Sequence, residues 1–275
     1  EEIEIKKQYH LSDEAIKEIF AILSSFYNFL LQENYTNNNP IAKIRQKSKF
    51  IRRQQETRKV RRLSELQWSF VMEAANSMAQ EDKRHERTLF VIAALYSMYL
   101  RISELVVTPR WAPKMSDFKR DHEGNWWFTT VGKGNKERSI AVSNHMLAAL
   151  KRWRKHLGLS PLPTIDDHSP LVIKERGKGG IKGTNKIREI VQGCFDRAIS
   201  MMEKAGFAEE EITDLRHATV HWLRHTGISD DVKRRPREHV RDDAGHSSSQ
   251  TTDRYIDIDR RDRHRSAKKK PITND

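Results

Sequence analysis

The sequence predicts an α+β fold that is mainly helical and carries a small antiparallel sheet. Apolar residues recur every three or four positions along residues 11–33, which is the spacing that gives an α-helix one apolar face. The period changes at residues 126–131, which are aromatic and β-branched. Alternation returns at residues 138–143, after the glycine-rich turn 132–136. This pattern is typical of a β-hairpin, so we expect helices on both sides of one hairpin.

The N-terminal part of the chain predicts a short helical region followed by a linker. The first helix has Ser12 as its expected N-cap, and it is expected to end before the polar run that finishes in Pro40. Residues 47–62 are dense in lysine, arginine and glutamine, and we interpret them as a basic linker. The expected divisions are residues 1–46, 47–62, 63–260 and a basic tail of 261–275.

The larger region after the linker is predicted to open with a helix. Ser64 and Gln67 fit a capping box, which marks a helix start. Pro161 and Pro163 indicate a loop. The helices expected in this region are about 64–80, 86–100, 145–157, 184–205 and 215–228.

The charge of the chain indicates a polyanionic partner. The formal net charge is +13 in 275 residues. Nucleic acid is the default partner for so basic a protein, and an anionic membrane surface is the competing one. The basic residues are spread along the whole chain, which favours a long DNA footprint. No apolar run approaches the roughly 20 residues that a membrane span needs.

Cysteine usage and the first residues restrict the class of protein further. Cys194 is the single cysteine, so neither a disulfide nor a cysteine-based zinc site is expected. We expect a buried, inert thiol and a reducing, intracellular setting. The chain starts with Glu-Glu-Ile-Glu-Ile, without Met or a secretory signal, so we expect a fragment of a longer protein.

Chemically informative residues are spread along the larger region in a fixed order. His246 follows Arg224 by 22 residues, and Tyr255 follows His246 by nine. His221 and Arg224 are three apart, so they share one face of a helix. The motifs are Arg101 in Leu-Arg-Ile-Ser-Glu-Leu, Lys133 in a Gly-Lys-Gly turn, His221 and Arg224 in His-Trp-Leu-Arg-His-Thr, His246 after Gly245, and Tyr255.

These motifs, in this order and at this spacing, resemble the catalytic domain of the tyrosine recombinases, also called the phage integrase family. The resemblance covers roughly residues 60–260. It implies a tyrosine-recombinase catalytic domain, preceded in residues 1–46 by the C-terminal part of a helical core-binding domain that contacts DNA. One departure is Tyr99, at a position where the family usually has glycine.

The resemblance implies a nucleophilic mechanism centred on Tyr255. This tyrosine would attack a DNA phosphodiester and keep the bond energy in a 3′-phosphotyrosyl intermediate. Because the pKa of tyrosine is about 10, the phenol needs a proton acceptor near neutral pH. His221 is the expected base or proton shuttle for it.

The remaining site residues are expected to serve the phosphate and the leaving group. Arg101 and Arg224 would grip the non-bridging oxygens bidentately, which lysine cannot do. His246 would hydrogen-bond the scissile phosphate. Lys133 is the expected proton donor to the leaving 5′ oxygen, with Lys136 as the alternative.

The resemblance also implies the partners of the protein and excludes cofactors. We expect double-stranded DNA as the substrate and a homotetramer on paired recombination sites. Neither a metal nor another cofactor is expected, because the cations of the site can replace a metal. The expected location is cytoplasmic and nucleoid-associated, without membrane attachment. A type IB topoisomerase-like enzyme and a catalytically inactive DNA-binding protein are the alternatives.

Several of these residues have plain structural interpretations. Glu104 is either a surface ion-pair partner of Arg101 or a buried carboxylate that holds it. Tyr255 has the alternative of an ordinary buried aromatic on a short helix. We interpret His225 as structural and Trp222 as core packing. The basic tail is interpreted as a solvated end, with packing onto a neighbouring protomer as the alternative.

Overall fold

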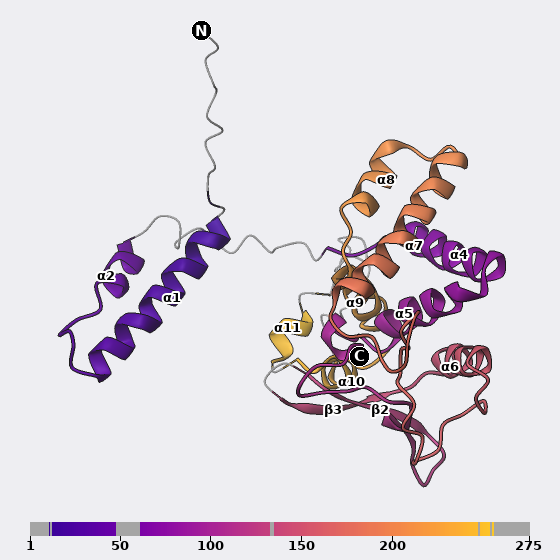
Figure 1. Cartoon of the computed structure of the whole chain (residues 1–275). Helices are drawn as coiled ribbons and strands as arrows, with labels where there is room; N and C mark the ends of the chain where they lie inside the picture. The colour runs from indigo at the N-terminus through magenta and orange to yellow at the C-terminus, as the bar shows by residue number, and fades with distance from the viewer. Residues whose placement is uncertain are drawn as a thin grey trace, which may run out of the picture. The chain divides into compact units, whose positions relative to one another are not determined.

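The computed structural model divides into two compact units, Glu1–Arg58 and Lys59–Asp275, which are drawn in Figure 1. Each unit has its own internal contacts. The predicted N-cap Ser12, most of the predicted linker and the predicted tail lie outside the residues that the structure describes. The described residues are 11, 13–47, 61–132, 135–246, 248–253 and 255.

The first unit consists of two helices in its described part. α1 spans Asp13–Gln32, which confirms the predicted first helix, and α2 spans Pro40–Lys47. Between them Asn34 takes a left-handed backbone with φ of 60°. The Asn39 side-chain oxygen accepts from the backbone N–H groups at the start of α2, at 3.0 and 3.3 Å. Pro40 therefore occupies a first helical position, where the missing N–H costs nothing.

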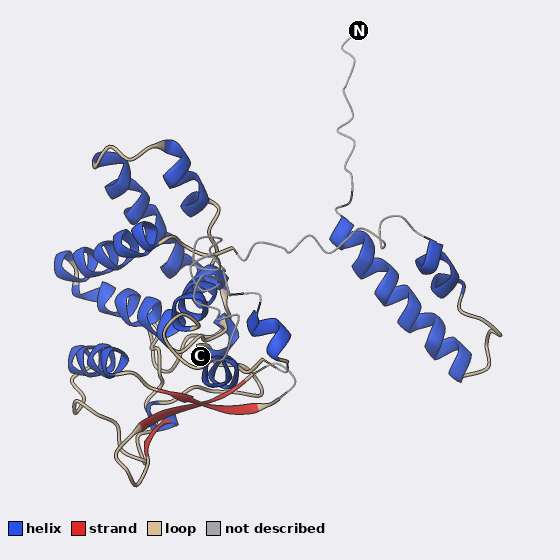
Figure 2. Cartoon of the chain, turned by 180° about the vertical axis from the view of Figure 1, so that it is seen from behind, coloured by secondary structure: helices blue, strands red, loops and turns tan. Residues whose placement is uncertain are grey.

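The second unit is a helical body with one small sheet. Figure 2 shows the three strands gathered at one side of the helices. This arrangement confirms the predicted fold class. In chain order the described elements are α4 (Glu65–Glu81), η1 (Lys83–His85), α5 (Glu86–Ser97), η2 (Ile102–Glu104), η3 (Met115–Asp117), β1 (Phe118–Arg120), β2 (Trp126–Val131), β3 (Glu137–Ala141), α6 (Asn144–His156), α7 (Asn185–Lys204), α8 (Glu209–Arg216), α9 (Val220–Asp231), α10 (Arg237–Ala244) and α11 (Ser249–Asp253).

The central helix of the second unit is α5. It packs against α4, α6, α7 and α9. Its consecutive residues Phe90, Val91 and Ile92 are all buried, so the helix is covered on nearly every side. Burial of each such side chain contributes about 1.5–3 kcal/mol. The segment that follows α5 carries Arg101 and is therefore anchored to the best-packed part of the core.

The sheet is antiparallel, with strand order β1-β2-β3. Phe128 in the middle strand pairs with Phe118 on one side and with Ile140 on the other. All three side chains are buried, which confirms the alternation predicted for the hairpin. Because side chains alternate along a strand, Arg138 lies on the same face as Ile140 and points toward the interior.

Two predicted helices differ from the structure. The helix expected at 86–100 ends at Ser97, because Tyr99 adopts a left-handed backbone with φ of 49° that cannot continue an α-helix. The helix expected at 215–228 is two helices, α8 and α9. Thr219 has an extended backbone between them and starts the second one.

The other predicted elements of the second unit are confirmed. Ser64 and Gln67 form the predicted capping box at α4. The helices expected at 145–157 and 184–205 are α6 and α7. Trp222 lies in the core, as does the buried Cys194, whose thiol pKa is raised to about 12 by burial. Within the described residues, no helix has the length and apolar character that a membrane span requires.

Candidate active site

Helix α9 carries three of the site side chains. It places His221 and Arg224 three residues apart, as predicted, and His225 directly after. The Arg224 side chain is almost fully buried, whereas His221 is exposed. The guanidinium of Arg224 donates to the backbone carbonyl of Tyr99, and at 2.6 Å to that of Ala244. Backbone groups from the segment after α5 and from the end of α10 therefore fix the orientation of this guanidinium.

Arg224 is a buried cation that is ready to receive an anion. Burial, followed by repulsion from Arg101 and Arg138, lowers its pKa to about 9. No ion pair joins it to a carboxylate within the part of the chain that the structure describes. Among the described residues it is held by the two carbonyls and, at 3.5 Å, by Nε2 of His246. A bound phosphate would offset the cost of burying this charge.

Arg101 lies at the start of η2, next to the carboxylate of Glu104. The Arg101 guanidinium donates to Glu104 at 3.1 Å, and the Arg101 backbone N–H donates to the other carboxylate oxygen at 2.8 Å. Glu104 is 1% exposed and the Arg101 side chain is 29% exposed. The buried alternative for Glu104 is therefore confirmed. Its carboxylate binds the Arg101 guanidinium and leaves part of this group exposed to solvent.

A further arginine, Arg138 on β3, shares this carboxylate and was not predicted. It donates to both oxygens of Glu104, at 2.7 and 2.8 Å, and through Nε to the Asp243 carbonyl at 3.0 Å. These bonds lower the pKa of Glu104, although burial acts in the opposite direction. The sequence held one signal for Arg138, since it shares a strand face with the buried Ile140.

Two glycines make room for the Arg138 side chain. A Cβ at Gly245 would lie 2.8 Å from Cδ of Arg138, and a Cβ at Gly132 would lie 3.1 Å from its Nη1. Gly245 also caps α10 in the left-handed conformation, with φ of 64°. The glycine before His246 thus ends the helix and permits close packing.

Tyr255 lies just after α11, in contact with two histidines. Its side chain is 7% exposed and belongs to a small apolar cluster with Tyr99 and Ala244. The Tyr255 hydroxyl and Nδ1 of His225 are 2.6 Å apart. The His246 ring stacks on the Tyr255 ring, with centroids 5.8 Å apart. The phenol is therefore both packed against apolar side chains and hydrogen-bonded to His225.

His246 connects the tyrosine to the buried arginine. Its Nε2 lies 3.5 Å from the Arg224 guanidinium, and its Nδ1 lies 2.8 Å from the Thr252 hydroxyl. Thr252 is itself buried on α11. These contacts hold the imidazole in one plane, with one nitrogen facing the cation.

All three histidines are held in the neutral form near neutral pH. Burial, followed by the neighbouring cations, lowers the pKa of His225 to about 3 and that of His246 to about 4. The pKa of His221 is also lowered, through partial desolvation of its ring by the surrounding protein and through Arg224 and Arg101. A neutral imidazole has one nitrogen lone pair, so each ring can accept one proton.

The structure brings five of the six predicted site residues into one neighbourhood. The sixth, Lys133, lies outside the described residues, and its alternative Lys136 is exposed directly before β3. Sequence reasoning missed Arg138 and the contact made by His225. The five residues brought together are Arg101, His221, Arg224, His246 and Tyr255.

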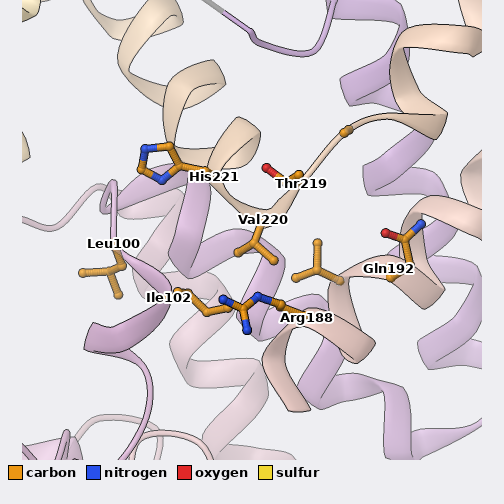
Figure 3. A pocket seen from close by; sticks show the side chains of 9 residues that line it. Leu100, Ile102, Arg188, Gln192, Thr219, Val220 and His221 are labelled. Atoms are coloured by element: carbon orange, nitrogen blue, oxygen red, sulfur yellow. The ribbon is translucent and has the colours of Figure 1, made fainter. Parts of the chain in front are cut away.

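A cavity of about 380 Å³ opens beside this cluster. Figure 3 shows Arg188 and Gln192 reaching it from α7, and Thr219, Val220 and His221 from the start of α9. The lining mixes apolar walls with these polar groups. No group of three His, Cys, Asp or Glu side chains that could hold a metal ion occurs among the residues described.

The fold and the site together define a class of protein: a helical domain with one small sheet, in which a tyrosine lies among buried arginines and neutral histidines. The chain belongs to the phage integrase family, whose family model matches residues 61–261.

Curated relatives are tyrosine recombinases. The XerD of Rickettsia bellii (strain RML369-C) is 27% identical over 154 residues, which is 55% of this chain and 46% of the relative. The XerD of Rickettsia conorii (strain ATCC VR-613 / Malish 7) is 26% identical over 151 residues, with the same shares. The chain thus spans about half the length of the curated relatives that it matches.

Solved structures share the fold at low identity. The Tn1549 transposon integrase in complex with transposon right end DNA has a TM-score of 0.59 at 18% identity, and the match covers 94% of this chain and 79% of that one. A lambda integrase dimer bound to a core site has a TM-score of 0.54 at 16% identity, covering 95% and 63%. XerA recombinase has a TM-score of 0.51 at 19% identity, covering 98% and 86%.

Proposed function

We propose that this chain acts in site-specific DNA recombination and that it cleaves and rejoins DNA through a 3′-phosphotyrosyl intermediate on Tyr255. The observation that carries the proposal is the neighbourhood of this phenol. It contacts His225 and stacks on His246, which in turn reaches the buried Arg224. A proposed nucleophile, neutral bases and a cation with no carboxylate partner among the described residues therefore occupy one site. The net charge of +13 favours a polyanionic substrate.

The two arginines of the site suit a transferring phosphate. Arg224 is fixed by two carbonyls, and Arg101 is fixed by Glu104 while remaining partly open. Each guanidinium has donors left for the non-bridging oxygens of a phosphodiester. Such preorganised donors stabilise the extra negative charge of the transition state, typically by a few kcal/mol for each donor.

The proposed reaction begins with attack of the Tyr255 oxygen on phosphorus, as the phenol proton passes to a neutral histidine of the site. The P–O5′ bond breaks, and the leaving oxygen takes a proton from Lys133, the donor expected from the sequence. His246, which the sequence led us to expect as a hydrogen-bond partner of the phosphate, lies beside Arg224. Religation is the reverse reaction, in which a 5′ hydroxyl attacks the phosphotyrosyl bond. The bond energy is conserved, so no nucleotide cofactor is needed.

The proposal extends to the assembly on DNA. Double-stranded DNA is the proposed substrate, and a homotetramer on paired sites is the proposed active form. The two helices of the first unit belong in this proposal to a core-binding domain that contacts the same DNA. The cytoplasmic, nucleoid-associated location expected from the sequence follows from a DNA substrate.

A plasmid assay tests the function. The full chain is incubated with a supercoiled plasmid that carries two copies of the DNA flanking its gene, and with a matched plasmid that lacks them. Recombinant products from the first plasmid only, absent with Tyr255→Phe, support the proposal. Relaxation of both plasmids to the same extent would show a topoisomerase-like enzyme instead. Binding without strand breakage on either plasmid would show a DNA-binding protein that does not cleave.

A further inference from the structure

The structure pairs the Tyr255 phenol with a histidine that was interpreted as structural from the sequence. Nδ1 of His225 lies 2.6 Å from the hydroxyl oxygen, the distance at which a phenol donates to a ring nitrogen. We propose that His225, rather than His221, is the base that takes the phenol proton when Tyr255 attacks. The inference rests on the proposed recombinase function and assigns one proton transfer within it.

The positions of the two histidines on α9 separate their roles. His221 and His225 are one turn apart, and their rings meet edge to face with centroids 4.4 Å apart. His221 is exposed and is one of the residues that line the cavity in Figure 3. His225 is half-buried and contacts the phenol directly. The direct contact with the phenol therefore assigns the role of base to His225 rather than to His221.

The protonation state of His225 suits an acceptor. The groups that face it are His221 and Arg224 on α9, His246 after α10 and the Tyr255 phenol. Burial, followed by His221, Arg224 and His246, lowers its pKa to about 3. The ring is then neutral near neutral pH. With its proton on Nε2, the Nδ1 lone pair points to the phenol, which donates to it.

Substrate binding makes this weak base stronger. Part of the pKa depression comes from Arg224, one of the two arginines that would hold the phosphate. A phosphodiester anion between Arg101 and Arg224 cancels part of that positive potential, so the pKa of His225 rises toward its ordinary value. The nucleophile is therefore activated only when DNA occupies the site. Without substrate, the low pKa of His225 keeps the Tyr255 phenol protonated.

The step balances as a nucleophilic substitution. The Tyr255 oxygen forms a bond to phosphorus while its proton moves to Nδ1 of His225, which becomes an imidazolium. The P–O5′ bond breaks, and the 5′ oxygen receives a proton from the separate acid. On religation His225 returns its proton to the phenolate oxygen as the phosphotyrosyl bond breaks.

The test measures single-turnover adduct formation by the full chain. The probes are nicked duplexes that tile the DNA flanking the gene, each made with an oxygen or a sulfur at the 5′ bridging position. A sulfur leaving group needs no proton, so a loss that persists with sulfur lies on the nucleophile side of the reaction. The variants are His225→Asn, whose amide oxygen keeps an acceptor near the Nδ1 position, His225→Gln, His221→Asn and Tyr255→Phe.

The proposal predicts a specific pattern of rates. His225→Asn and His225→Gln form adduct about 100- to 1000-fold more slowly with both probes, which is in the range for loss of a general base. Their melting temperatures and duplex affinities remain close to those of the parent chain. The rate of adduct formation by the parent chain falls at acid pH as His225 becomes protonated. This acid limb of the pH–rate profile is absent in His225→Asn. His221→Asn retains the limb.

Two outcomes overturn the assignment while leaving the recombinase function intact. One is a parent-like rate in both His225 variants with Tyr255→Phe inactive. The other is loss of the acid limb in His221→Asn and its retention in His225→Asn. Adduct formation by Tyr255→Phe would instead reject the function on which the inference rests.

Discussion

Glu104 and Arg138 form a bidentate ion pair, with both carboxylate oxygens held at 2.7 and 2.8 Å by the guanidinium. The carboxylate is 1% exposed and the Arg138 side chain is 9% exposed. The same carboxylate also receives Arg101, at 3.1 Å. Two arginines therefore share one buried carboxylate, and the more buried of them neutralises it. This leaves the more exposed Arg101 available to a substrate.

Arg138→Ala is expected to destabilise the protein more than Arg101→Ala. Removal of Arg138 leaves Glu104 buried without its main partner, which costs about 3–5 kcal/mol of unfolding free energy. Arg101→Ala leaves that pair in place, so it costs less stability, but it abolishes cleavage through loss of a phosphate ligand. Denaturant unfolding and adduct formation, measured on both variants, check this contrast. Equal stability losses in the two variants would contradict the assignment of Arg138 as the main partner.

Gly227→Ala is expected to destabilise the packing of α9 on α5. A Cβ at this position would lie 2.1 Å from the backbone oxygen of Tyr96, so the two helices would have to separate. We expect a loss of about 3 kcal/mol or more. Gly193→Ala on α7 is the matched control, because nothing lies within 4 Å of its Cβ. That variant should gain about 0.5–1 kcal/mol. Thermal unfolding of both variants and of the parent chain tests this prediction. A Gly227→Ala variant as stable as the parent chain would show that α5 and α9 pack less closely than the structure indicates.

Tyr99→Gly is expected to be less stable than Tyr99→Phe, although it relieves the left-handed backbone. The relief is worth about 1–2 kcal/mol, whereas loss of the buried ring costs about 3–5 kcal/mol. Tyr99→Phe loses only the hydroxyl contacts to the charged Asp231 and Arg235, about 1.5–3 kcal/mol, and the glycine variant loses these contacts as well. Denaturant unfolding of the pair gives the order. A more stable glycine variant would show that strain outweighs packing here.

The protein is expected to lose stability as the pH falls from about 7 to about 5. His225 and His246 have folded pKa values of about 3 and about 4, whereas the unfolded value is about 6.5. The unfolded chain therefore binds more protons in this window, and the contribution present above about pH 6.5 is lost on acidification. His225→Asn should flatten the dependence of melting temperature on pH.

A histidine control makes this pH measurement specific. His122→Asn replaces a side chain that is 91% exposed, so its surroundings barely change on folding. The pH dependence of this variant should match that of the parent chain. An equal effect of His122→Asn and His225→Asn would mean that acid acts on the surface charge as a whole.

Local patterns predict most elements of the fold, because these elements are fixed by neighbours in sequence. The capping box of Ser64 and Gln67 and the hairpin around residues 132–136 are examples. The errors occur where distant contacts decide. Helix α5 ends early at the left-handed backbone of Tyr99, whose side chain bonds to Asp231, 132 residues away. That partner has no trace in the sequence around Tyr99.

In the candidate site, too, local sequence predicts some residues, whereas distant contacts determine others. Ordered motifs indicate Arg101, Arg224 and Tyr255 directly, because the chemistry restricts which residue types can bind phosphate or attack it. No local sequence pattern predicts the ion pair of Arg138, because its pairing with Glu104 depends on how the hairpin packs against η2. The contact between His225 and the Tyr255 hydroxyl also depends on packing, since the two residues are 30 positions apart in the chain.

Mapping the covalent adduct tests the central claim most directly. The full chain is reacted with the sulfur-bridged duplexes, digested with protease and nuclease, and analysed by mass spectrometry. The account predicts one modified peptide, with the nucleotide attached through the oxygen of Tyr255, and no adduct in Tyr255→Phe. A nucleotide on any other residue, or an adduct that survives in Tyr255→Phe, would contradict it.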